Sequence, residues 1–339
     1  MAGPSANPEP ARPGTHVDGM TWVPGATFRM GSNDHYPEEA PVHSVTVDGF
    51  WIDNTPVTNR EFALFVEVTG YRTLAERPLD PADFPGAPPE NLVAGSLVFT
   101  PTAGPVDLLH LSQWWTWTPA ACWSRPEGAG SSLAGRDEHP VVHVAHEDVE
   151  ACATWAGKAL PTEAEWERAA RGGLDGAVYT WGDDPERGGA RLAHYWHGDF
   201  PWRADPGYGT TAPVGSYPPN GFGLLDMAGN VWEWTSDWYV DRHPEVPDKP
   251  CCVPVNPRGA RIEESYDPAQ PQFAIPRKVI KGGSFLCADT YCMRYRPSAR
   301  RPQMIDTGMS HVGFRCVVRP AIPPSGGAGP AEPPEPARR

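Results

Sequence analysis

The chain has 339 residues, of which 40% are hydrophobic and 10% aromatic, enough to bury a substantial core. Its formal net charge of −14 disfavours nucleic acid and anionic membrane as partners, because both are bound through clustered Lys and Arg. No apolar run reaches the length of about 18 residues that indicates a membrane span. Residues 1–19 lack the apolar stretch of a signal peptide, so we expect a cytoplasmic protein.

Two tails flank one predicted domain. Residues 1–19 and 320–339 are mixtures rich in Pro, Gly and Ala that offer little to bury, so we expect both to be disordered. Residues 20–319 show no internal boundary and are predicted to form a single domain. Within it, residues 79–135 form a long Pro-rich excursion, and loops of that length are uncommon unless they are functional.

Local signals predict three helices. Two of them begin with a capping box and end at a glycine, and the third covers residues 147–156, where small apolar residues lie on one face. The two capping boxes and the glycines that follow them are Thr58, Glu61 and Gly70, and Thr162, Glu165 and Gly172.

Strand-like runs occur at Val42–Val47, Lys278–Phe285 and Phe314–Val318, separated by long segments rich in turn residues. Strands do not alternate regularly with helices, which excludes a parallel α/β sheet. The predicted fold class is therefore α+β, an irregular and loop-rich single domain.

The segment that begins at Lys281 contains two cysteines five residues apart, Cys287 and Cys292. On a helix their side chains would point about 140° apart, so a shared ligand requires a turn, which Asp289 and Thr290 favour. Two facing thiolates are soft ligands that select Cu(I), zinc or an iron–sulfur cluster over magnesium or calcium. Two ligands are few for structural zinc, but they leave a position where a third thiolate can bind.

A second interpretation of the same spacing is structural. Two cysteines separated by four residues can also form a small disulfide or occupy unrelated places in the core. Cys251 and Cys252 are neighbours in a Pro-rich loop and could bind metal or oxidise, and the sequence assigns them no role.

Seven sequence blocks occur in order along residues 20–318. They are Gly31-Ser32, Val57-Thr58-Asn59, Leu160 to Glu167, Asn220 to Leu224, Gly229 to Trp234, Lys281 to Ser284 and Gly313 to Cys316. Together they resemble the signature blocks of the formylglycine-generating enzyme, or sulfatase-modifying factor, family. The residues between Cys287 and Cys292 look closer to an actinobacterial-type subgroup. The resemblance implies a C-type-lectin-like domain poor in regular secondary structure, in agreement with the predicted elements.

The resemblance also implies an activity. In this family two cysteines hold Cu(I), and a cysteine in a C-x-P-x-R motif of an unfolded sulfatase polypeptide joins as a third ligand. O2, with a thiol reductant, then oxidises that cysteine to Cα-formylglycine. By this resemblance Cys287 and Cys292 are the copper ligands of a catalytic site, and Ser284, Tyr291 and Trp232 line the pocket for the substrate thiol and oxygen.

Four further residues border that pocket by resemblance. Arg294 and Arg300 are expected to brace it, and Asp306 and His311 lie in the stretch that borders it in relatives. His311 stands where an asparagine is expected, which leaves its role open.

The resemblance places two structural calcium sites in the chain, since oxygen ligands suit this hard cation. The first uses the side chains of Asp226 and Glu233 with the carbonyls of Gly229 and Val231. The second uses Asp205 with the carbonyls of Tyr195 and Gly207, and is weakened because His194 stands where an asparagine is expected.

Cys152 and Cys316 match a pair that is bridged in some relatives, and we expect free thiols in a reducing cytosol. Two other functions stay open at this point. The chain could be a non-catalytic lectin-like binding module with a disulfide between Cys287 and Cys292. It could also be related to iron-dependent sulfoxide synthases, although these need an upstream helical bundle with clustered histidines.

Overall fold

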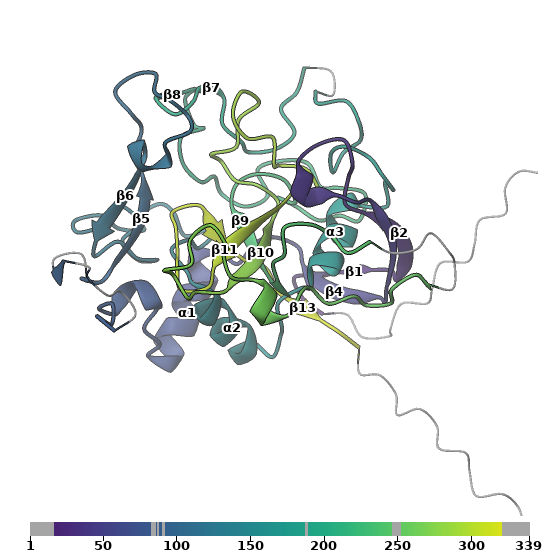
Figure 1. Cartoon of the computed structure of the whole chain (residues 1–339), viewed down its shortest axis with the longest axis horizontal. Coiled ribbons are helices and arrows are strands. Elements are labelled where there is room, and N and C mark those ends of the chain that lie inside the picture. Colours follow the sequence, from purple (N-terminus) through teal and green to yellow (C-terminus); the bar gives the residue numbers. More distant parts are fainter. Residues whose placement is uncertain are drawn as a thin grey trace, which may run out of the picture.

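The structure is a computed structural model that describes residues 17–320, except 83–85, 87, 90, 91, 187, 188 and 246–251. Figure 1 shows a small central sheet with short elements and long connections around it. The strands of the described residues form five sheets. The irregular α+β class predicted from the sequence is confirmed.

The central sheet has the strand order β11-β10-β9-β12. Its strands pair antiparallel, except that β12 runs parallel to β9. They are β9 (Trp232–Trp238), β10 (Arg277–Lys281), β11 (Arg300–Met304) and β12 (Val312–Gly313). The second sheet has the order β1-β4-β13, which joins the two ends of the described chain. Its strands are β1 (Met20–Val23), β4 (Phe50–Asp53) and β13 (Val317–Val318).

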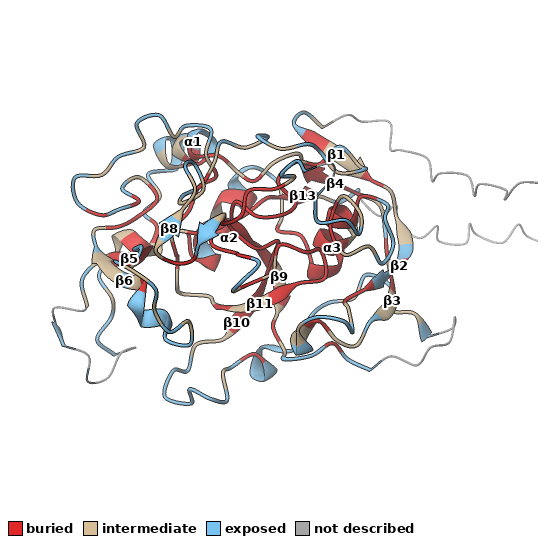
Figure 2. Ribbon diagram, turned by 90° about the horizontal axis from the view of Figure 1, so that it is seen from above, coloured by how far each residue is buried: buried red, intermediate tan, exposed pale blue. Residues whose placement is uncertain are grey.

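Three antiparallel hairpins complete the strands. They are β2 (Ala26–Met30) with β3 (His43–Val47), β5 (Gly95–Phe99) with β6 (Trp115–Pro119), and β7 (Gly198–Asp199) with β8 (Arg203–Ala204). In Figures 1 and 2 the β5–β6 hairpin and the β2–β3 hairpin lie at opposite ends of the long axis, with β9 and β10 between them.

The three predicted helices are confirmed as α1 (Asn59–Thr69), α2 (His146–Trp155) and α3 (Glu163–Arg171). Both predicted capping boxes form, and Gly70 and Gly172 end their helices in the left-handed conformation, φ 68° and 56°. Short 3-10 turns occur at Pro37–Glu39, Leu74–Glu76, Leu111–Gln113 and Ile262–Glu264.

The strand predictions are partly wrong in extent. The run predicted to reach Phe285 ends at Lys281, because Gly282 and Gly283 adopt φ +93° and +72°, which a strand does not. The Pro-rich excursion is not all loop, since it contains the β5–β6 hairpin. The structure also begins before the predicted domain, with a turn in which Met20 N donates to Val17 O at 3.1 Å.

The core consists of three apolar clusters. Figure 2 shows the buried residues along β9, β10 and α3, with exposed loops around them. Both Cys287 and Cys292 belong to the largest cluster. Trp115 and Tyr291 pack against this cluster and also against the aromatic cluster around Trp114. The two cysteines therefore lie near the junction of two apolar clusters.

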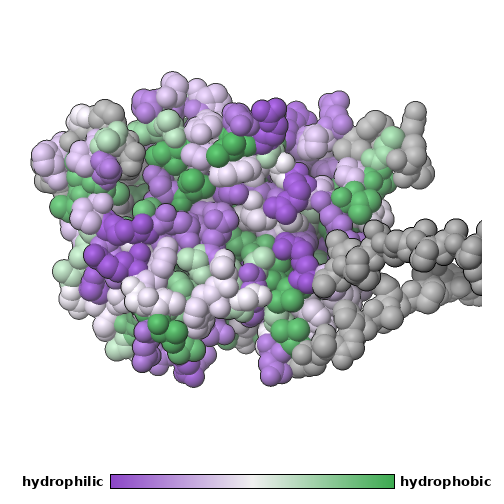
Figure 3. Space-filling model, turned by 90° about the horizontal axis from the view of Figure 1, so that it is seen from below, coloured by the Kyte–Doolittle hydropathy of each residue, from purple (hydrophilic) through white to green (hydrophobic). Residues whose placement is uncertain are grey.

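The surface is mixed. Figure 3 shows one face, on which apolar side chains form separate patches between hydrophilic ones. Scattered single apolar side chains of this kind are normal on a globular protein. Among the described helices, none is long and apolar enough to cross a bilayer.

Candidate active site

The loop after β10 is shaped by two glycines. A Cβ atom on Gly283 would lie 2.8 Å from Arg294 O and 2.9 Å from Tyr295 Cα, so only glycine allows these backbones to approach. A Cβ atom on Gly282 would lie 2.9 Å from the Trp166 ring. The two glycines thus allow the loop that carries the cysteines to pack between Trp166 of α3 and the backbone of residues 294–295.

The predicted turn between the cysteines is present. Cys292 N donates to Ala288 O at 2.7 Å, and Tyr291 N donates to the same oxygen at 3.0 Å. This turn brings Cys287 Sγ and Cys292 Sγ to 3.5 Å, and both side chains are buried. Ser284 N donates to Cys287 Sγ at 3.5 Å. The structure holds the two cysteines as free, facing thiols and not as a disulfide.

The two thiols differ electrostatically. The hydrogen bond from Cys287, with the charges of Arg294 and Arg301, lowers the pKa of Cys292 to about 6. Burial raises the pKa of Cys287 well above its ordinary value, and the neighbouring Cys292 adds to the effect. The thiol of Cys292 therefore ionises more readily than the thiol of Cys287.

Arg294 clamps this thiol, as the resemblance led us to expect. Its Nη1 lies 3.8 Å from Cys292 Sγ, and its Nη2 donates to Glu38 Oε1 at 2.6 Å. The guanidinium lies 3.7 Å from the ring centroid of Tyr36, whose hydroxyl accepts a hydrogen bond from Met293 N. Tyr36 and Glu38 lie about 250 residues away in sequence and were not predicted as site residues.

The expectation that Arg300 braces the thiol pocket is wrong. Arg300 donates to both carboxylate oxygens of Glu163, at 2.7 and 3.0 Å, and is buried. Side chains alternate along a strand, so Arg301 faces the other way. Its charge contributes to the lowered pKa of Cys292. Arg301 therefore takes the role that the sequence assigned to Arg300.

Ser284 is connected to His311, whose role the sequence left open. Ser284 Oγ lies 3.1 Å from His311 Nδ1, and both residues are buried. Burial, with Arg301 and a second histidine, lowers the pKa of His311 well below its ordinary value, so the ring is neutral. Trp115 packs edge-on against that ring at 4.7 Å. Trp232 lies in the same cluster as the cysteines, and its N donates to His311 O at 2.8 Å.

Tyr291 forms an aromatic wall beside the turn. Its ring stacks on Phe200 at 4.5 Å and meets Trp114 edge-on at 5.8 Å. Burial raises the pKa of Tyr291, so its phenol is neutral and can donate a hydrogen bond. Ser284, Tyr291 and Trp232 thus lie around the thiol pair, as the resemblance led us to expect.

Asp289, inside the cysteine turn, receives a short hydrogen bond from the Tyr295 hydroxyl. The Tyr295 ring stacks on Tyr195 at 4.2 Å and on Tyr179 at 5.9 Å. From its sequence, Asp289 is expected only to favour the turn between the two cysteines. The contact shows that the turn is also anchored to an aromatic stack.

The donor set fits a soft metal ion. Two buried thiols face each other, one is readily ionised, and an apolar cluster surrounds them. Cys287 and Cys292 would hold Cu(I), as the resemblance implies.

The first predicted calcium site contains a cation already. Both oxygens of Glu233 accept hydrogen bonds from Arg315 at 2.7 Å, and Oε2 also accepts one from Trp166 Nε1. Asp226 Oδ2 accepts from Gly215 N at 2.6 Å. Arg315 also donates to the backbone oxygen of Asp226. Glu233 thus has a cationic partner in this structure, and the calcium assignment stays a prediction.

The second predicted site is similar. Asp205 Oδ2 accepts from Arg191 Nη2 at 2.9 Å. His194 Nε2 lies 2.7 Å from Thr210 O, and burial lowers the pKa of the His194 ring. Calcium at Asp205, Tyr195 and Gly207 also stays a prediction.

The remaining cysteines are placed only in part. Cys152 and Cys316 are both buried and free, and burial raises the pKa of each thiol. Cys252 is exposed, and Cys251 lies outside the described residues.

The fold and the facing thiols define a small, loop-rich domain of the sulfatase-modifying factor class. A family described as the sulfatase-modifying factor enzyme 1-like domain matches residues 5–320. The chain therefore belongs to the formylglycine-generating enzyme, or sulfatase-modifying factor, family.

Curated relatives agree. A formylglycine-generating enzyme of Mycobacterium tuberculosis is 52% identical, over 88% of this chain and 97% of that protein. One of Thermomonospora curvata is 45% identical, over 89% of this chain and 94% of that protein. A Bos taurus relative named an inactive Cα-formylglycine-generating enzyme 2 is 36% identical over 90% of this chain and 89% of its own. Because the family includes a relative named inactive, activity is argued from the residues of the site and not from family membership alone.

Two solved structures share the fold. PvdO from Pseudomonas aeruginosa superposes with a TM-score of 0.56 at 24% identity, over 88% of this chain and 93% of that one. Treponema denticola variable protein 1 superposes with a TM-score of 0.53 at 21% identity, over 89% and 95%. At these identities the likeness concerns the fold alone.

Proposed function

We propose that this protein is a formylglycine-generating enzyme that oxidises the cysteine of a C-x-P-x-R motif in a sulfatase polypeptide to Cα-formylglycine, using copper and O2. The observation that carries the proposal is the pair of free, facing thiols of Cys287 and Cys292. It occurs in a chain 52% identical to a named enzyme of this activity.

Electron counting requires a co-reactant. Conversion of a CH2–SH group to an aldehyde, with release of sulfide, removes two electrons from the substrate carbon. Reduction of O2 to the aldehyde oxygen and water takes up four electrons. A thiol reductant must supply the other two, and it leaves as a disulfide. We therefore propose a thiol reductant as the second partner besides the substrate polypeptide.

Bound Cu(I) would supply a soft centre that attracts the substrate thiolate and reacts with O2. The protein's own groups prepare that encounter. Arg294 and Arg301 hold negative charge at Cys292, which favours the deprotonated ligand. Ser284, oriented by the neutral His311, can donate or accept a proton beside the sulfur atoms.

The aromatic wall keeps water away from the reacting sulfur. Tyr291, Phe200 and Trp114 pack against one another at ring distances of 4.5 to 5.8 Å. A cysteine inside a folded domain could not reach thiols this deeply buried, so the substrate is expected to be an unfolded segment. Such segments are available during synthesis, in keeping with the predicted cytoplasmic location.

The test is the mass of a C-x-P-x-R peptide after incubation with copper-loaded protein, thiol reductant and air. We expect the peptide to lose the mass that corresponds to conversion of cysteine to formylglycine. The mass of a peptide with serine in place of cysteine should not change. Cys287→Ser and Cys292→Ser should abolish conversion and remove the Cu(I) held by this thiol pair, measured as the loss of one bound equivalent in competition with a coloured Cu(I) chelator.

A peptide that binds to the copper-loaded protein and keeps its mass would overturn the proposal. The non-catalytic binding module would then be the better interpretation, as for the relative named inactive.

A further inference from the structure

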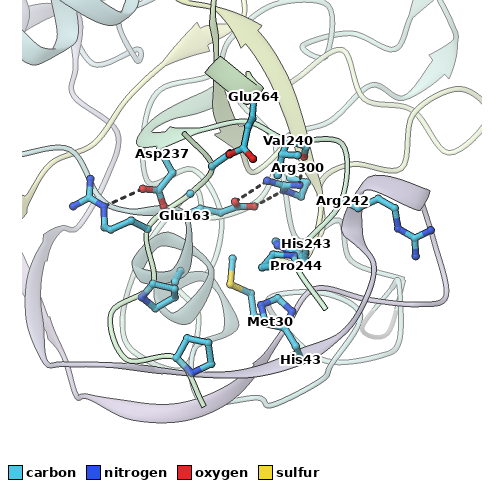
Figure 4. A pocket seen from close by; sticks show the side chains of 16 residues that line it. Met30, His43, Glu163, Asp237, Val240, Arg242, His243, Pro244, Glu264 and Arg300 are labelled. Atoms are coloured by element: carbon cyan, nitrogen blue, oxygen red, sulfur yellow. Dashed lines mark hydrogen bonds and ion pairs between the residues drawn. The ribbon is translucent and has the colours of Figure 1, made fainter. Parts of the chain in front are cut away.

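A cavity of about 330 Å³ lies beside the β2–β3 hairpin, away from the thiol pair. Figure 4 shows its lining, in which Met30, His43 and His243 lie on one side and the Glu163–Arg300 ion pair on another. No part of the proposed reaction uses these three residues. The β11 strand separates the two places, since Arg300 lines the cavity and Arg301 acts on Cys292.

The hairpin register places Met30 directly opposite His43. Directly opposed residues of an antiparallel pair point to the same face, with Cβ atoms about 5 Å apart. Met30 is buried and His43 is half-buried at the edge of the cavity. A thioether and an imidazole are therefore neighbours by construction of the hairpin.

His43 has one ring nitrogen available. Its Nδ1 lies 2.9 Å from Pro41 O, and a carbonyl oxygen can only accept, so Nδ1 carries the proton. With the proton on Nδ1, the lone pair of Nε2 is available to a metal ion. Metal-binding histidines commonly show this pattern, with the other nitrogen donating to a backbone carbonyl.

His243 brings the third group. Its N donates to Ala40 O at 2.9 Å, which ties its loop to the hairpin, and its ring lies 4.9 Å from the ring of His43. A Cβ atom on residue 31 would lie 3.2 Å from His243 Cδ2, so Gly31 gives the ring room. His243 is 7% exposed, and its Nε2 is buried without a hydrogen-bond partner in the protein.

A buried polar atom without a partner costs free energy, so its presence calls for a ligand. On the hairpin, the ring of His43 and the side chain of Met30 line the same cavity as His243 (Figure 4).

We propose that Met30, His43 and His243 form a second Cu(I) site, with one thioether and two imidazole ligands. A thioether selects a soft ion, and imidazole also suits copper. Zinc would need nitrogen, thiolate or carboxylate ligands, and the described residues hold no cluster of three His, Cys, Asp or Glu side chains that could bind a metal. The inference does not depend on the oxidase activity.

The electrostatics of the cavity permit a monovalent cation. Arg300 and Glu163 neutralise each other across a bidentate contact. Asp237 also lines the cavity and is partly balanced by Arg258 at 3.2 Å. A dication would find no carboxylate free to offset its second charge among these pairs.

The experiment first removes the facing thiols and the adjacent pair Cys251 and Cys252, which leaves Cys122, Cys152 and Cys316 buried in the core, so the histidine and methionine variants must identify the ligands. In a C251S/C252S/C287S/C292S protein, competition with a coloured Cu(I) chelator should still show one bound Cu(I). X-ray absorption of that protein should show nitrogen ligands and one sulfur ligand. Adding Met30→Leu should remove the sulfur signal, and adding His243→Leu should remove the bound equivalent.

His43→Gln tests the site without disturbing the core, because His43 is half-buried, and it should also lose the bound ion. His110→Gln, at an exposed histidine elsewhere, is the matched control and should keep it. The proposal is overturned if the cysteine-depleted protein binds no Cu(I). It is equally overturned if binding survives both His43→Gln and His243→Leu in folded protein.

Discussion

Two neighbouring arginines show how one residue of strand register decides a role. Arg300 is buried and holds Glu163, while Arg301 is partly exposed and acts on the thiol pair. Arg300 and Arg301 are adjacent and identical in type, so the sequence alone does not separate their roles. The alternation of side chains along β11 does so.

Arg301→Met should therefore lower peptide conversion with little loss of stability, because a partly exposed charge contributes mainly through its field on Cys292. Arg300→Met should do the reverse, since it removes the bidentate partner of the buried Glu163 and leaves Lys281 at 3.7 Å as its nearest cation, a loss of up to about 3–5 kcal/mol. Conversion rates and thermal unfolding of the two variants form a matched comparison. If Arg301→Met unfolds as readily as Arg300→Met, the assignment of the two faces is incorrect.

At the scale of elements, the N-terminus of α2 is organised by one buried carboxylate. Asp148 Oδ2 accepts from Ala145 N at 2.8 Å, and Oδ1 accepts from Leu74 N at 3.0 Å and the Tyr71 hydroxyl at 3.1 Å. Burial raises the pKa of Asp148 from 3.8 to about 6 in spite of these bonds. The carboxylate thus joins α2 to the turn after α1.

This shift has a defined sign. Between pH 3.8 and about 6 the folded state binds more protons at Asp148 than the unfolded state does. Stability contributed by Asp148 should therefore fall as pH rises through that window, by up to about 3 kcal/mol. Asp148→Asn cannot titrate, so the difference in free energy of unfolding between wild type and variant should change across the window. Glu147→Gln, at the exposed neighbouring position, is the control. A difference independent of pH would contradict the assignment.

The elements that the sequence predicted are those with short-range signals. The capping box at Thr58 and the glycine at 70 lie within one helix, so α1 could be predicted from its own residues. The β5–β6 hairpin was missed although Trp115–Pro119 alternates aromatic residues and threonines, because proline dominates the surrounding composition. A period-two scan of that segment would have found the strand.

The residues of the candidate site also divide into those with short-range sequence signals and those without. Ser284, Cys287 and Cys292 belong to one short segment and could be predicted from spacing and resemblance. The Glu38 carboxylate reaches Arg294 from the other end of the chain. No local pattern encodes such a contact, because it depends on how the 3-10 turn Pro37–Glu39 docks against β11 of the central sheet.

At the scale of the whole molecule, Arg315 ties several segments together. It holds Glu233 of β9 and donates to the backbone oxygens of Asp53 and Leu225. Glu233→Gln should lower the free energy of unfolding by about 3–5 kcal/mol, because a buried guanidinium loses its counter-charge. Denaturant unfolding should show this loss equally in calcium and in chelator.

Calcium itself is tested on the wild type, where Glu233 and Arg315 are intact. The calcium prediction requires that Ca²⁺, and not Mg²⁺, raises the melting temperature and that a chelator reverses the rise. A melting temperature that does not change with calcium would contradict the calcium prediction. Arg315 would then be the cation that Glu233 holds at the predicted site.

The parallel pairing of β12 with β9 has a consequence for the order of events during synthesis. His311 and Arg315 emerge from the ribosome about 80 residues after Trp232 and Glu233, the residues that they contact. Until residues 311–318 are made, Ser284 lacks its histidine and β4 lacks its pairing with β13. The nascent chain therefore carries both cysteines before it can enclose them, and the reactive centre cannot close until these residues have been made.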